Sequence, residues 1–101
     1  MWLFAMFDLP VDTKDARRQY TRFRKHLLDE GFIMIQFSVY ARYCPSEEHA
    51  AAYRKHARDA LPPDGEVRLL SVTDKQFGKM EVYLGEERQE PEEPPKQLML
   101  F

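Results

Sequence analysis

The stretch WLFAMFDLP, residues 2–10, decides the fold, because six apolar residues in a row lead into an acid, a leucine and a proline. An unbroken apolar run of this length is typical of a strand buried on both faces. Pro10 cannot donate a hydrogen bond to a sheet, so the strand ends before it. We therefore expect a buried strand over residues 2–7, with Asp8 at its end.

A helix and two short strands are predicted next. Asp12 or Thr13 can cap a helix that ends at Gly31, and its apolar residues recur at helical spacing. The stretch FIMIQFSVYARYC, residues 32–44, is rich in β-branched and aromatic residues, so it is strand. It is long for a single strand, and a break near Gln36 would make two. The apolar stripe of the helix is Ala16, Tyr20, Phe23 and Leu27.

The remaining elements are a second helix and two further strands. Ser46 caps the helix, whose first turn carries acids that the helix dipole favours. After a Pro-Pro-Asp-Gly turn, strands are predicted over Glu66–Thr73 and Gln76–Leu84. The order is that of a ferredoxin-like β-α-β-β-α-β fold of the α+β class, with an additional C-terminal strand. The stripe of the second helix is Ala50, Tyr53, Ala57 and Leu61.

The first strand also predicts a partner. Two helices cover one face of such a sheet, yet Trp2, Phe4 and Met6 point to the other face. Leaving these side chains in water would forgo roughly 4–8 kcal/mol. We therefore expect a homodimer packed through the sheets.

Length and composition limit the number of domains, the disulfides and the location of the protein. The chain of 101 residues suffices for one domain, and Cys44, its single cysteine, excludes an internal disulfide. The apolar start is too short for a signal peptide or a membrane span, so we expect a cytoplasmic protein. Residues 1–84 form the predicted domain, 85–97 an acidic, proline-rich linker, and 98–101 an apolar docking segment.

Asp8 is the first candidate for chemistry. It shares parity with Trp2, Phe4 and Met6, so a dimer through that face brings two Asp8 carboxylates together. Paired carboxylates with water suit Mg²⁺, which could activate water or stabilise charge on a phosphate. The alternative is a strand-end aspartate that caps the following turn.

A basic face on the first helix is the second candidate. Between Lys14 and Lys25 there are six basic residues and one acid, although the whole chain has a net charge of −2. Basic side chains on successive turns can follow a phosphate backbone without reading its sequence. The alternative is a solvated helix face. The candidate contacts are Lys14, Arg17, Arg18, Arg22 and Lys25.

Three motifs in order resemble the CRISPR-associated protein 2 family: the strand ending in FDLP, the helix RRQYTRFRKHL and the strand QFSVY. The resemblance covers about residues 1–84. It implies a ferredoxin-like homodimer in which Asp8 is the acidic Mg²⁺ ligand for phosphodiester cleavage. The chain departs from the pattern in having Phe7 where many members have Tyr, which removes a hydroxyl near that site.

The resemblance also implies partners. The dimer would bridge two dimers of the CRISPR integrase, CRISPR-associated protein 1, and hold a short prespacer DNA duplex. Arg17, Arg18 and Arg22 would contact the DNA backbone. Gln36 and Ser38 fall on the family's Gln-x-Ser-Val signature and would lie near Asp8.

The C-terminal residues Gln97, Leu98, Leu100 and Phe101 form a candidate docking motif. In the family this segment can add a strand to the partner subunit's sheet or contact the integrase. The stretch QLMLF also resembles the bacterial sliding-clamp-binding pentapeptide, so a sliding clamp is an alternative partner.

Three functions follow from these observations. The first is a DNA-binding subunit of spacer acquisition, with Mg²⁺-dependent endonuclease activity as an added property. The second is a stand-alone, toxin-like, metal-dependent endoribonuclease. The third is a ferredoxin-like module that binds RNA on an open sheet face through Trp2 and Phe4.

Overall fold

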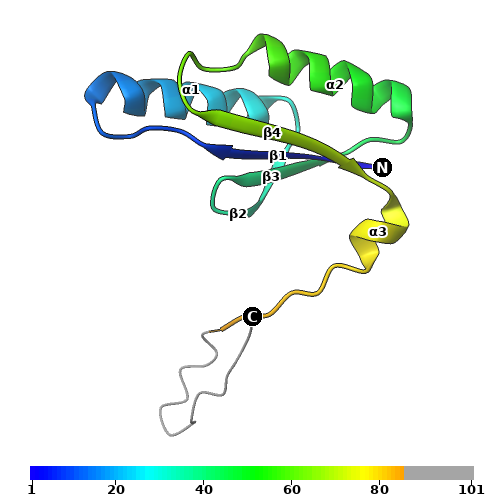
Figure 1. Ribbon diagram of the computed structural model, residues 1–101. Coiled ribbons are helices and arrows are strands. Elements are labelled where there is room, and N and C mark those ends of the chain that lie inside the picture. Colours follow the sequence, from blue (N-terminus) through cyan, green and yellow to red (C-terminus); the bar gives the residue numbers. More distant parts are fainter. Residues whose placement is uncertain (86–101) are drawn as a thin grey trace, which may run out of the picture.

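The computed structural model describes residues 1–85 (Figure 1). The elements follow one another as β-α-β-β-α-β-α, and the first six form the predicted ferredoxin-like arrangement. None of the helices in this part of the chain is long and apolar enough to cross a membrane. The elements are β1 (Trp2–Asp8), α1 (Lys14–Asp29), β2 (Ile33–Gln36), β3 (Val39–Tyr43), α2 (Glu47–Asp59), β4 (Glu66–Val72) and α3 (Asp74–Gly78).

The strands form one antiparallel sheet in the order β2-β3-β1-β4. β1 is central and pairs with β3 on one side and with β4 on the other. Helices α1 and α2 lie on one face of this sheet, and α3 lies on the opposite side (Figure 1). We call the face under α1 and α2 the covered face and the other the open face.

The covered face holds the hydrophobic core. Leu3, Ala5 and Phe7 of β1 meet Phe23 and Leu27 of α1, and all five are at most 7 % exposed. Phe7 contacts Phe23 edge to face at 5.3 Å between ring centroids. The helical stripe read from the sequence is thus the stripe that packs on the sheet.

Local boundary residues also lie where the sequence predicts them. The side chains of Thr13 and Ser46 accept backbone N–H bonds at the starts of α1 and α2. Gly31 follows α1 with a φ of +91°, the left-handed conformation that glycine adopts without a steric penalty. The predicted break in residues 32–44 is real, because β2 ends at Gln36 and a turn separates it from β3.

The predicted strand over Gln76–Leu84 is wrong for this chain. Residues 74–78 form the short helix α3, and no strand follows it up to residue 85. The physical reason is a capping box: the Thr73 side chain accepts from the Gln76 N–H, and the Gln76 side chain accepts from the Thr73 N–H. Two reciprocal local bonds start a helix where the apolar residues further on suggested a strand.

The open face is also less exposed than expected. Phe77 of α3 stacks on Trp2 with 4.1 Å between ring centroids, and Phe4 is only 8 % exposed. Trp2 and Met6 are half-buried, so a single chain already shields much of the row of side chains that we expected to need a partner. Apolar surface remains on this face and at its β2 edge, where Ile33, Tyr43 and Leu70 are 53 %, 46 % and 52 % exposed. The predicted docking segment 98–101 and nearly all of the linker lie outside the described residues.

Candidate active site and nucleic-acid interface

Asp8 is the last residue of β1 and its side chain is exposed. In the register of β1 and β4, Asp8 lies opposite Glu66, so two carboxylates from different strands share this end of the sheet. Gly65 allows its own backbone to lie close to that of Asp8, because a Cβ at residue 65 would lie 2.8 Å from the carbonyl oxygen of Asp8.

Asp8 lines a shallow pocket of about 240 Å³. Of the two residues that the family resemblance places near Asp8, Ser38 lines the same pocket and Gln36 does not. Ser38 is the one non-glycine residue with positive φ, 61°, within residues 1–85. Its carbonyl oxygen accepts from the Phe7 N–H at 3.0 Å, and its hydroxyl lies 3.4 Å from the Tyr20 hydroxyl. These contacts hold the β2–β3 turn against β1 and α1 in a backbone conformation that is unfavourable for serine.

Sequence reasoning missed two further residues of this pocket, Glu66 and Arg68. Their side chains form an ion pair at 2.9 Å, and both are exposed. Glu66 follows a clear turn in the sequence, but only the antiparallel register of β4 against β1 places it opposite Asp8. Register between strands this far apart along the chain cannot be read from local residue patterns.

The carboxylates at Asp8 fit a Mg²⁺ site in which water supplies most of the ligands. Mg²⁺ in proteins keeps several waters and takes one or two carboxylates as ligands, so Asp8 with Glu66 suffices on chemical grounds. Arg68 competes for the Glu66 carboxylate. Residues 1–85 contain no cluster of three or more acidic, histidine or cysteine side chains, so one chain offers no closed protein cage. When bound, the ion would supply charge stabilisation at a phosphate or an activated water.

The predicted basic residues form one surface on α1. This basic surface surrounds an open hollow of about 520 Å³, to which Thr21 also contributes. Asp8 is not among the residues that line this hollow and lies in the other pocket instead. The structure therefore offers a basic surface and an acidic pocket as distinct features. The basic surface consists of Lys14, Arg17, Arg18, Arg22 and Lys25.

The ion pairs that the basic surface forms within the chain are weak. Arg18 pairs with Asp15 at 3.2 Å and Lys25 with Asp29 at 3.5 Å, and all four side chains are at least 66 % exposed. Exposed pairs of this kind contribute about 0–1 kcal/mol. A phosphate can therefore displace these carboxylates at little cost.

A comparison with known protein families finds one that matches most of the chain. The family model described as CRISPR associated protein Cas2 matches residues 1–80. The chain belongs to this family.

Relatives in the family match over the whole chain. The CRISPR-associated endoribonuclease Cas2 of Parvibaculum lavamentivorans is 52 % identical over 101 residues, which is 100 % of both chains. The protein of the same name from Flavobacterium psychrophilum is 45 % identical over 100 % of this chain and 88 % of its own.

A solved structure of the family has the same fold. The crystal structure of Streptococcus pyogenes Cas2 at pH 6.5 matches with a TM-score of 0.62, covering 82 % of this chain and 99 % of that one. The sequence identity is 15 %, so this likeness concerns the fold alone.

Proposed function

We propose that the chain is a dimeric, nucleic-acid-binding subunit of CRISPR spacer acquisition. The basic surface on α1 carries the proposal, because its five cations lie on one helix and are all exposed. Family membership supplies the CRISPR context. In this proposal the dimer bridges two dimers of the CRISPR integrase, CRISPR-associated protein 1, and holds a prespacer DNA duplex.

The chemistry of the basic surface favours the phosphate backbone as its ligand. Lysine and arginine side chains neutralise phosphates and release condensed counterions, which makes binding strong at low salt and weak at high salt. No aromatic side chain lines the hollow, so base stacking has no part in it. We therefore expect binding that depends little on sequence and steeply on salt.

The dimer is supported by the apolar surface that remains on the open face. Leu70, 52 % exposed, lies on the edge strand β4 opposite Phe4 of the central strand β1. A second copy packed there would bury this row of side chains on both chains at once. Asp8, which shares parity with Phe4, would then approach its symmetry mate.

Two arginines on α1 allow a matched test of DNA binding. Arg22 lines the hollow, whereas Arg24 is equally part of α1 and exposed but lies outside it. We expect Arg22→Ala to weaken binding of a short duplex and to lower the slope of log affinity against log salt by about one. Arg24→Ala should leave the slope unchanged. Equal effects of the two variants in a salt titration would overturn the assignment of this surface.

The bridging role needs its own experiment. The wild-type chain, the integrase and a DNA duplex should co-purify as one complex, and Arg17→Ala with Arg18→Ala should reduce its DNA content. Retention of DNA by the double variant, or no complex with the integrase, would count against the acquisition role.

A metal-dependent endoribonuclease is the second candidate function. It is favoured by the pocket at Asp8, where Glu66 adds a second carboxylate, and by the names of the two bacterial relatives. Asp8→Asn should abolish Mg²⁺-dependent cleavage, with Asp12→Asn, an exposed loop aspartate, as control. Cleavage of RNA alone by the purified chain would favour a stand-alone, toxin-like enzyme, and cleavage that survives Asp8→Asn would exclude this site.

The RNA-binding alternative meets an obstacle in α3. Phe77 already stacks on Trp2 with the rings nearly parallel, 9° apart, so that face of the indole is not free for a base. A monomer that binds RNA and loses it on Trp2→Ala would favour this third function.

The docking role of Gln97, Leu98, Leu100 and Phe101 remains part of the proposal. Deleting residues 97–101 separates its alternatives. Loss of the integrase complex would indicate docking within the acquisition assembly, whereas an intact complex with lost binding to the sliding clamp would favour the clamp.

A further inference from the structure

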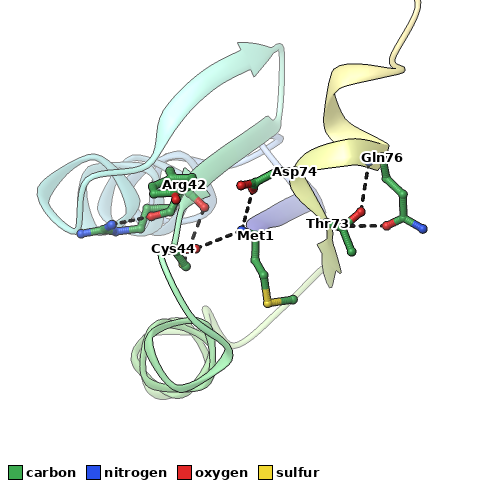
Figure 2. A network of polar contacts seen from close by, with 7 residues as sticks. Met1, Arg42, Cys44, Thr73, Asp74 and Gln76 are labelled. Atoms are coloured by element: carbon green, nitrogen blue, oxygen red, sulfur yellow. Dashed lines mark hydrogen bonds and ion pairs between the residues drawn. The ribbon is translucent and has the colours of Figure 1, made fainter.

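The amino terminus forms the centre of a polar network at one end of the sheet. The α-ammonium of Met1 donates to the Cys44 carbonyl oxygen at 3.0 Å and to Asp74 Oδ1 at 2.6 Å (Figure 2). The Met1 carbonyl oxygen in turn accepts from the Cys44 N–H at 2.8 Å. Met1 therefore extends the β1–β3 ladder by one residue, and the same nitrogen reaches across to α3.

Helix α3 is held on the open face by two contacts. Its first residue, Asp74, pairs with the Met1 ammonium, and its fourth, Phe77, stacks on Trp2 at 4.1 Å between ring centroids. Phe77 also lies 6.0 Å from the ring of Phe4. None of the residues of α3 is fully buried, so few other contacts fix its position.

We propose that the α-amino group of Met1 is a modification-sensitive site that controls the position of α3. As a free ammonium it holds α3 against the open face. A formyl group, an acetyl group or a preceding peptide on this nitrogen weakens the hold on α3, so that α3 opens and uncovers Trp2 more often.

The number of N–H donors on the Met1 nitrogen decides how many acceptors it can satisfy. A free ammonium has three N–H donors and a positive charge, enough for both the Cys44 carbonyl and the Asp74 carboxylate. An acylated nitrogen has one N–H and no charge. It can satisfy one of the two acceptors, and the ladder position favours Cys44, so Asp74 loses its partner.

Release of α3 has consequences beyond the helix itself. Residues 79–85 follow α3 directly, and Val82, Tyr83 and Leu84 in this segment are at least 69 % exposed. Because α3 joins β4 to this segment, a shift of α3 also moves residues 79–85. The state of the amino terminus therefore affects both the cover over Trp2 and the position of this apolar segment.

The chain carries its own reporter for this test, because Trp2 is its only tryptophan. Three proteins should be compared: the chain with a free Met1, the same chain preceded by Gly-Ser, and Asp74→Asn. We expect the extension and Asp74→Asn each to raise acrylamide quenching of Trp2 and the hydrogen exchange of residues 74–78. An exposed ion pair predicts an increase in α3 opening of about two- to fivefold.

Asp59→Asn is the matched control. Asp59 is 64 % exposed, as is Asp74, and it pairs with Lys55 at 3.2 Å on α2, far along the chain from Trp2. This variant should leave Trp2 quenching unchanged. Phe77→Ala gives the signal of a fully uncovered Trp2, and if it does not change quenching, α3 does not cover Trp2 and the proposal fails.

A double change distinguishes the Met1–Asp74 contact from general loosening. If the two groups act through one another, adding the extension to Asp74→Asn has no further effect on quenching or exchange. Additive effects, or an extended chain that matches the free one, would overturn the proposal. Each measurement reports on α3 and Trp2 directly and needs neither DNA nor the integrase, so its outcome does not depend on the proposed role in spacer acquisition.

Discussion

The two faces of the sheet differ in how completely one chain can cover them. On the covered face, α1 and α2 bring long apolar stripes onto β1, and residues such as Leu3 and Leu27 are 0 % exposed. On the open face a five-residue helix shields Trp2 and Phe4, while Leu70 remains 52 % exposed. The covered face therefore supplies the stability of the domain, and the open face is available for contacts with other molecules.

The largest effect is expected on the covered face. Leu27→Ala should lower the free energy of unfolding by about 2–5 kcal/mol, because it leaves a cavity among fully buried side chains. The adjacent Leu28, 40 % exposed on the same helix, provides the control, and Leu28→Ala should cost less than about 0.5 kcal/mol. Denaturant unfolding measures both, and similar midpoints would show that α1 does not pack as described.

The next effect concerns the open face and the proposed dimer. Leu70→Arg should raise the dissociation constant of the dimer by at least about tenfold, since burying a leucine is worth about 1.5–3 kcal/mol. Stability of the monomer should change little. Leu61→Arg, 45 % exposed in the α2–β4 turn, is the control. Sedimentation analysis that finds the Leu70 variant as dimeric as wild type would place the interface elsewhere.

A comparison of two helix caps tests whether the faces fold as one unit. Ser46→Ala should cost about 1 kcal/mol of global stability, because α2 contributes Ala50 and Ala57 to the buried residues. Thr73→Ala removes the cap of α3 and should raise hydrogen exchange in residues 74–78 about fivefold, with a smaller change in global unfolding. Equal shifts in the unfolding midpoint would mean that α3 belongs to the cooperative core.

The smallest effect is a pH dependence from the buried thiol. Burial raises the pKa of Cys44 above its ordinary value, with the Arg42 guanidinium as the main opposing influence. Above that ordinary value the thiol ionises in the unfolded chain first, so the unfolded state binds fewer protons and stability falls as pH rises. Between about pH 8 and 10, unfolding of Cys44→Ala should show a flatter pH dependence than wild type. Parallel curves would contradict this assignment.

The sequence by itself determined the local elements and the family. Thr13 and Ser46 cap their helices, Gly31 follows α1, and the sheet breaks after Gln36, because each depends on neighbours within a few residues. The apolar run over residues 2–7 also predicted the strand β1. The cap of α3 was equally local, since Thr73 and Gln76 form a capping box, but the apolar residues that follow favoured the wrong prediction of a strand.

Tertiary structure decided the features that join distant parts of the chain. Glu66 lies opposite Asp8 only through the register of β4, Phe77 meets Trp2 only because α3 folds back on the open face, and Met1 reaches Asp74 across 73 positions. The sequence predicted Asp8 but not the carboxylate opposite it. The physical reason is that such contacts depend on how sheet and helices pack together, and no spacing within one segment encodes that packing.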